Sequence, residues 1–282
     1  MKPLYLEVTG EKALFTDPIS PIERRSYTVP TFSALRGLLE SIYWHPGVDY
    51  IVDKVCVMNK ANYIPIKMTR LKDKTSLKKV AKEMKDGTVG SISINPKSGS
   101  DLMTLRTDSF LKNVRYLIEF RFDRQYDKND KMGSYDEFHK KTLKILCDHL
   151  RPGKERIYRT PFLGTKSCEA KVKRLTGEEF NALKEESYYK GTEHELRSLF
   201  YKFKYNDDNT EIEKSLFIPS IVMKDGVLDY RGYSKNNGRF FVADAPSDYV
   251  SKTYEKDGKE FAFGYDLFPD DSEWVISEDN NI

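Results

Sequence analysis

The 282-residue chain has the length of one large domain or two unequal ones. Its hydrophobic residues (39%) and aromatic residues (13%) are too many for a disordered chain, and no stretch approaches the roughly 18 apolar residues of a membrane-spanning helix. The formal net charge of +3 gives no direct indication of a partner.

The charge is unevenly distributed along the chain. Residues 206–282 hold 8 Lys and Arg against 17 Asp and Glu, a net charge of -9, whereas residues 1–205 hold 39 against 27, a net charge of +12. Residues 54–106 alone hold 12 basic and 4 acidic side chains. Such a cluster is either a solvated lysine-rich loop or a surface that contacts the phosphates of a nucleic acid, and composition does not decide between them.

The first residues and the cysteines indicate the compartment. Residues 1–10 have the alternation of a strand and lack the basic start and long apolar stretch of a secretory signal, so we expect a cytoplasmic protein. The three cysteines are an odd number with no close pair, which argues against a disulfide framework and against a CxxC metal site.

A proline-rich connection over 13–30 precedes the first predicted helix. Thr31 can cap this helix, Leu35, Leu38 and Leu39 lie on one face of it, and Pro46 stops it. Residues 49–58 and 63–68 are predicted to be extended, and residues 60–113 to form a basic, exposed insertion.

Residues 114–123 alternate strictly between apolar and polar side chains and predict a strand. Ser134 and Glu137 fit a capping box at the start of a second helix, which runs to Pro152, and residues 168–173 predict a further strand. The order β-α-β-insertion-β-α-β indicates an α+β fold of the ferredoxin-like, RRM-like type, with two helices on one face of the sheet and the other face free for a ligand.

The acidic end of the chain is predicted to be a separate β subdomain. Residues 220–230 read as a hairpin around Lys224, Asp225 and Gly226. We therefore expect a domain over 1–205 and a small antiparallel β subdomain over 206–282.

Candidate chemistry is limited to groups that transfer protons. The sequence has no Walker A pattern and no HExxH, and its four histidines do not lie at zinc-ligand spacings. What remains is Tyr43 at the end of the first helix and His139, Lys140 and Lys141 near the start of the second. If the two helices are antiparallel, these positions meet.

Each candidate also has a structural interpretation. His139 lies on the apolar stripe and can be a hydrogen-bonded core histidine, Tyr43 can be a boundary aromatic, and both lysines can be solvated. Gly164 either lets the backbone approach RNA or another chain closely, or is an ordinary turn glycine.

Five segments together resemble one family. They are ALFT at 13–16, ERRSYTVPT at 23–31, ALRGLLESIYWHP at 34–46, NVRYLI at 113–118 and PFLGTKSC at 161–168. They are similar to the CRISPR-associated Cas family 5 proteins of subtype I-C, which belong to the RAMP superfamily and process precursor crRNA.

The resemblance implies an RRM-like domain followed by a small β-sheet, and cleavage without a metal or other cofactor at a Tyr, Lys, His site. Tyr43 matches the tyrosine and His139 the histidine, but Phe138 stands where the family has its lysine, so Lys140 or Lys141 has to replace it. The implied partners are the precursor crRNA repeat, the crRNA 5′ handle, and the large and backbone subunits of Cascade. Predicted RNA contacts are Arg24, Arg25, Arg36, Lys67, Arg70, Lys72, Lys74, Lys78, Lys79, Gly164 and Lys166.

We accordingly expect an endoribonuclease that cuts the repeat stem-loop and stays bound to the 5′ handle within type I-C Cascade. One alternative is a non-catalytic subunit that caps the 5′ handle of a crRNA made by another enzyme. A more distant alternative is a general RNA-binding module.

Overall fold

The structure is a computed structural model of the chain. It describes residues 2–18, 23–71, 85, 103–124, 133–151, 157, 159–205, 212–233, 240–244, 254–256, 259–261 and 276–277. Four predicted RNA contacts lie outside the described residues, namely Lys72, Lys74, Lys78 and Lys79.

Among the described residues, ten strands form one antiparallel sheet beside three helices, so the predicted α+β class is confirmed. The helices are α1 (Phe32–Ile42), α3 (Tyr135–His149) and α4 (Gly177–Lys184). The strands are β1 (Leu4–Ala13), β2 (Val48–Val57), β3 (Asn62–Leu71), β4 (Met103–Arg124), β5 (Lys171–Leu175), β6 (Glu193–Tyr205), β7 (Ile212–Lys224), β8 (Val227–Asp229), β9 (Phe240–Asp244), β10 (Tyr254–Lys256), β11 (Lys259–Phe261) and β12 (Ile276–Ser277). Strands β10 and β11 pair separately, and the large sheet has the order β12-β9-β7-β8-β2-β4-β1-β5.

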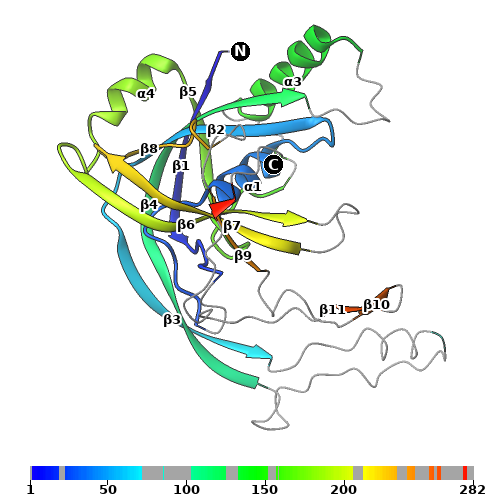
Figure 1. The fold of residues 1–282 in the computed structure, drawn as a ribbon. Coiled ribbons are helices and arrows are strands. Elements are labelled where there is room, and N and C mark those ends of the chain that lie inside the picture. The colour runs from blue at the N-terminus through cyan, green and yellow to red at the C-terminus, as the bar shows by residue number, and fades with distance from the viewer. Residues whose placement is uncertain are drawn as a thin grey trace.

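Strand β4 connects the body of the sheet to a long ribbon. Its second half pairs with β1 and β2, while its first half pairs with β3 from Asn62 opposite Lys112 to Leu71 opposite Met103. Figure 1 shows this β3–β4 ribbon projecting from the body away from α3 and α4. Part of the predicted insertion is therefore regular β structure.

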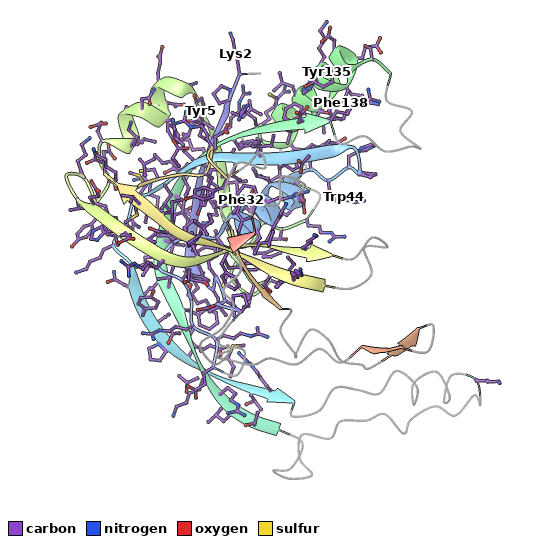
Figure 2. All side chains as sticks on the ribbon, viewed as in Figure 1. Lys2, Tyr5, Phe32, Trp44, Tyr135 and Phe138 are labelled. Carbon is purple, nitrogen blue, oxygen red and sulfur yellow. The ribbon has the colours of Figure 1, made fainter. Side chains whose placement is uncertain are left out.

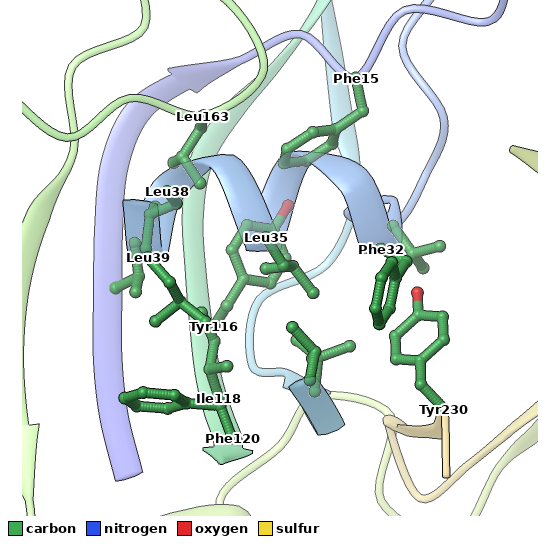
Figure 3. Close-up of a cluster of buried hydrophobic side chains, with 14 of the residues drawn as sticks. Phe15, Phe32, Leu35, Leu38, Leu39, Tyr116, Ile118, Phe120, Leu163 and Tyr230 are labelled. Atoms are coloured by element: carbon green, nitrogen blue, oxygen red, sulfur yellow. The ribbon is translucent and has the colours of Figure 1, made fainter. Parts of the chain in front are cut away.

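The main core lies between α1 and one face of the sheet. The Thr31 side chain accepts a hydrogen bond from the Ala34 amide at the predicted cap, and the leucines of the predicted stripe are buried. They pack on alternate residues of β4, including Tyr116 and Phe120, as Figure 3 shows. Each such side chain contributes about 1.5–3 kcal/mol on burial, which holds α1 firmly on the strands.

The second face of the sheet carries a helix that the sequence reading missed. Phe180 of α4 packs on Tyr5 of β1, with ring centroids 4.9 Å apart, and on Leu117 of β4. A capping box between Thr176 and Glu179 starts this helix. The expectation of a wholly free second face is thus wrong, because α4 covers part of it.

The remainder of this second face is held by ion pairs. Asp53, which is buried at a bulge in β2, accepts two hydrogen bonds from the Arg121 guanidinium at 2.6 and 2.7 Å. Lys54 pairs with Glu119, and Arg115 with Glu7. These pairs cross between neighbouring strands and fix their register.

Strands β7, β8, β9 and β12, which follow residue 205, extend the same sheet. The predicted hairpin is confirmed, with Lys224 opposite Val227 and positive φ angles at Asp225 and Gly226. Strand β8 then pairs with β2 of the first half, and β7 pairs with β6 across the predicted boundary. Within the described part of the chain, no helix is long and apolar enough to cross a membrane.

Candidate functional site

Tyr43 ends α1 and is tied down through its backbone. Its amide donates to the Leu39 carbonyl, and its carbonyl accepts a 2.7 Å hydrogen bond from the Tyr50 hydroxyl. Burial raises the pKa of Tyr43, so its hydroxyl stays protonated at neutral pH and can donate a hydrogen bond. The next residue, Trp44, is 53% exposed and lies on the same side of the molecule as Tyr135 and Phe138 in Figure 2.

The imidazole beside Tyr43 is that of His149, at the far end of α3. The two rings meet edge to face with centroids 5.7 Å apart, and His149 Nδ1 lies 2.9 Å from the Ile42 carbonyl oxygen. A proton on Nδ1 therefore donates to the last turn of α1. His149 joins the ends of the two helices, which gives it a structural role that the sequence reading did not assign.

His139 lies near the start of α3, ten residues before His149 and about 15 Å away along the helix. The structure thus brings the end of α3, and not its start, to the end of α1. The predicted meeting of Tyr43 with His139 is not what the structure has, because His149, at the other end of α3, occupies the place beside Tyr43.

The His139 ring is packed among aromatic rings. Its centroid lies 4.2 Å from that of Tyr135, 5.2 Å from Phe122 and 5.4 Å from Phe138. Its side chain is 15% exposed, and Nε2 is 4.0 Å from a carboxylate oxygen of Asp123, beyond hydrogen-bond distance. Among the described residues, neither ring nitrogen has a hydrogen-bond partner, although both are buried.

This environment differs from both interpretations of the sequence. Among the described residues, His139 has no hydrogen-bond partner, so it is not the hydrogen-bonded core histidine of one interpretation. Its two ring nitrogens are also buried, so they do not face solvent as a catalytic histidine would. Buried polar atoms without partners are uncommon in folded proteins, and each asks for an explanation. The aromatic packing accounts for the burial of the His139 ring, but it does not account for two polar nitrogens in an apolar environment.

Three lysines line the outer face of α3. Lys140, Lys141 and Lys144 are all exposed, and the predicted capping box between Ser134 and Glu137 holds the start of this helix. The lysines next to His139 are therefore free to meet a polyanion at the surface.

Several predicted RNA contacts have partners within the chain. Arg70 of β3 forms an ion pair with the carboxylate of Asp108, whose side chain is 1% exposed, and Asp108 also accepts from the Arg24 amide at 3.2 Å. Arg36 pairs with Glu40 of its own helix at 2.9 Å and with Asp49 at 3.0 Å. Arg70 and Arg36 thus have structural roles that charge counting alone could not reveal.

Other predicted contacts lie at the surface. Arg24 and Arg25 are exposed beside β4, where Arg25 bridges to Ser109. Lys67 is exposed on the face of the ribbon opposite Arg70, and Lys166 is exposed in the loop before β5. These four residues remain available to a ligand.

Gly164 has a positive φ of 85° in the loop that precedes β5. A Cβ at this position would overlap the carbonyl oxygen of Leu14, whose amide bonds the carbonyl of Leu163 at 3.1 Å. The close approach inferred from the sequence therefore exists within the chain, where its partner is the backbone of Leu14. The positive φ and the contact with Leu14 both require a residue without a Cβ at position 164.

Among the described residues, no group of three or more His, Cys, Asp or Glu side chains is arranged to hold a metal ion.

The antiparallel sheet and its helices make this an α+β protein. The basic residues of the projecting β3–β4 ribbon give it a surface suited to a polyanion. Residues 4–231 match the family model described as CRISPR-associated protein (Cas_Cas5), in its Cas5d group. The chain belongs to this family, which confirms the resemblance found in the sequence.

Two curated relatives are named CRISPR pre-crRNA endoribonuclease Cas5d. The protein of Mannheimia succiniciproducens is 35% identical over 123 residues, or 41% of this chain and 50% of the relative. The protein of Thermus thermophilus is 30% identical over 170 residues, or 60% of this chain and 63% of the relative. The matches therefore span between half and two thirds of the length of these relatives.

Two solved structures have a similar fold. A crystal structure of a CRISPR-associated protein is 29% identical, with a TM-score of 0.57, over 82% of this chain and 92% of the other. A protein from Streptococcus mutans, described as functionally uncharacterized, is 27% identical, with a TM-score of 0.54 and the same two coverages.

Proposed function

We propose that this chain is an endoribonuclease of the cytoplasm that cuts precursor crRNA at the repeat stem-loop and stays bound to the 5′ handle in type I-C Cascade. Its partners there are the large and backbone subunits. The observation that carries the proposal is the family match over residues 4–231, together with relatives named for this activity. The exposed lysines of α3 and of the ribbon support binding to RNA.

The proposal includes a division of the chain. We assign the RNA-binding and processing residues to 1–205, with a ferredoxin-like unit at its centre, and give 206–282 a supporting role. The strand order β2-β4-β1-β5, with α1 and α3 as the connecting helices, supports the ferredoxin-like unit. The pairing of β8 with β2 supports the role given to the second part.

The reaction is an attack by the ribose 2′-OH on the adjacent phosphate. His139 takes the 2′-OH proton, the 2′-oxygen bonds to phosphorus, and the bond to the 5′-oxygen breaks as that oxygen gains a proton. The products are a 2′,3′-cyclic phosphate and a 5′-hydroxyl, and no metal takes part. Lys140 or Lys141 stabilises the charge that develops on the phosphate.

Access to His139 requires a local movement. Tyr135 covers the imidazole, and its hydroxyl donates a 2.9 Å hydrogen bond to Asp123. Tyr135 is itself 53% exposed, so RNA can displace its ring without disturbing the core. Imidazole is the side chain that most often serves in general acid–base proton transfer, which suits the role proposed for His139.

The buried nitrogens of His139 are also the observation that favours a second candidate, a non-catalytic subunit that binds the 5′ handle. Incubating the purified protein with its own repeat hairpin in EDTA separates the two. Cleavage at one site supports the endoribonuclease, whereas binding without cleavage supports the non-catalytic subunit.

Tyr43→Phe tests the part that the tyrosine hydroxyl plays. Because the raised pKa keeps this hydroxyl protonated, it acts as a donor that positions RNA and not as a base. We expect cleavage to fall about ten-fold at every pH from 6 to 9, with an unchanged shape of the pH profile. A loss confined to high pH would show instead that Tyr43 acts as the ionised base.

Lys67 and Arg70, both on β3, provide a matched comparison of an exposed cation with a paired one. Arg70→Met is expected to lower the free energy of unfolding by about 3 kcal/mol, because it leaves the Asp108 carboxylate buried without its cation. Lys67→Met should leave stability unchanged and reduce the slope of log affinity against log salt by about one unit. Denaturant titration and RNA binding at several salt concentrations measure both effects. A loss of stability in Lys67→Met, or a changed salt slope with wild-type stability in Arg70→Met, would contradict these roles.

A further inference from the structure

A small cavity lies beside the first half of α1, away from Tyr43. It has a volume of about 300 Å³, is open on one side, and is bordered by α1, by the loop around Gly164 and by the second half of β6. Its walls include the aromatic rings of Phe162, Phe200 and Phe203, and Arg24 lies at its margin.

Gly37 forms part of the cavity wall in the middle of α1. Glycine is among the least favourable residues in a helix interior, so an isolated one calls for a packing or functional reason. Among the described residues the fold gives none, because a Cβ on Gly37 would meet none of their atoms within 4 Å and its φ is not positive. By contrast, a Cβ on Gly164 or on Gly226 would collide with backbone atoms.

The missing side chain keeps the cavity open down to the helix backbone. A methyl group here would meet no atom of the described residues, so the space beside Gly37 can receive an occupant. Phe162 and Phe203 are half-buried, which leaves part of each ring accessible. Among the described residues, the Arg24 guanidinium has no carboxylate partner, and its side chain is exposed.

These features match the chemistry of one unpaired nucleotide. Flat aromatic rings stack on nucleobases without needing a particular base, and an arginine binds the phosphate. The volume is at the lower end of the range for pockets that hold small ligands, which excludes a duplex and suits a single base.

We propose that this cavity holds one unpaired nucleotide of the bound RNA, with its base against Phe162 and Phe203, its phosphate at Arg24, and Gly37 leaving room for it. This inference rests on the proposed function, since it takes RNA to be the ligand. It adds a nucleotide subsite distinct from the groups at the two ends of α3.

A size series at position 37 tests the subsite. Gly37→Ala and Gly37→Leu should each keep the thermal midpoint at or above that of wild type, because both residues favour the helix and the first atom they add enters open space. Affinity for the repeat hairpin and for a single-stranded 5′ handle oligonucleotide should fall progressively, by about ten-fold or more for the leucine. Fluorescence anisotropy at one salt concentration measures this.

Two further variants complete the experiment. Gly232→Leu is the control, because Gly232 also faces open space but lies outside the cavity, and its RNA affinity should equal that of wild type. Phe203→Leu removes the flat ring while keeping an apolar side chain, and should weaken binding to a similar extent as Gly37→Leu. It also provides the test if Gly37→Leu fails to fold.

Wild-type affinity in both Gly37→Leu and Phe203→Leu would overturn the subsite while leaving the proposed function intact. Unchanged RNA affinity with lost assembly of the Cascade subunits would also overturn it, because the occupant would then be a protein. If the wild-type protein itself fails to bind its repeat RNA, the proposed function fails, and the subsite fails with it.

Discussion

His139→Phe is expected to lower the rate of repeat cleavage by about 10²-fold or more, with RNA affinity close to wild type. The variant replaces the imidazole with an apolar ring of similar shape among Phe122, Tyr135 and Phe138. Because neither nitrogen has a partner among the described residues, their loss should leave the free energy of unfolding unchanged or increase it. Single-turnover cleavage and denaturant titration measure the two quantities separately.

His139→Ala and His149→Ala serve as comparisons. His139→Ala removes the ring as well and should cost about 1–3 kcal/mol of stability in addition to the lost cleavage. His149→Ala removes the bond to the Ile42 carbonyl and should cost about 1 kcal/mol while RNA is still cut. Full cleavage by His139→Phe would show that His139 is a packing residue only.

Gly164→Ala is expected to lower the free energy of unfolding by about 3 kcal/mol or more. A non-glycine residue at a φ of 85° is strained by about 1–3 kcal/mol, and the added Cβ would also overlap the Leu14 carbonyl. Since the group that it meets is backbone, relief requires β1 or the loop to shift. The variant should unfold at a lower denaturant concentration than wild type.

Gly37→Ala is the stability control for this change. It adds the same methyl group to a helical glycine with open space, and should raise the free energy of unfolding by up to about 1 kcal/mol. If Gly164→Ala kept wild-type stability and lost RNA affinity, the close approach at Gly164 would be to RNA and not to Leu14.

The elements with strong local patterns were predictable from the sequence. Thr31 followed by the leucine stripe predicts α1, and the alternation over 114–123 predicts the second half of β4. Local sequence was sufficient because each pattern has one buried face, and burial selects a single register.

The first half of β4 was missed for the opposite reason. Within this half of β4, one face carries Thr104, Arg106 and Asp108, and the other mixes Met103 and Leu105 with Thr107 and Ser109. No sustained apolar alternation therefore marks the strand. Helix α4 is eight residues long and buries only Phe180, which is too weak a pattern to predict.

The candidate site depends on contacts between residues far apart in the sequence. Tyr43 could be singled out by its position at a helix end, but its neighbour could not. His149 is placed beside the Tyr43 ring by a hydrogen bond to the Ile42 carbonyl, 107 residues away in the sequence. The role of Arg70 likewise depends on Asp108, which lies 38 residues away. Charge and spacing identify candidate residues, and the tertiary fold decides which of them are free to act.

The central claim is that this chain cuts its repeat RNA through the ribose 2′-OH. The direct measurement compares the wild-type protein on two repeat hairpins in EDTA, one all-ribose and one with a single 2′-deoxy nucleotide at the mapped cleavage position. We expect the all-ribose hairpin to give a 2′,3′-cyclic phosphate and a 5′-hydroxyl, and the deoxy hairpin to be bound but left intact. Cleavage of the deoxy hairpin, or no cleavage of the all-ribose hairpin, would contradict the claim.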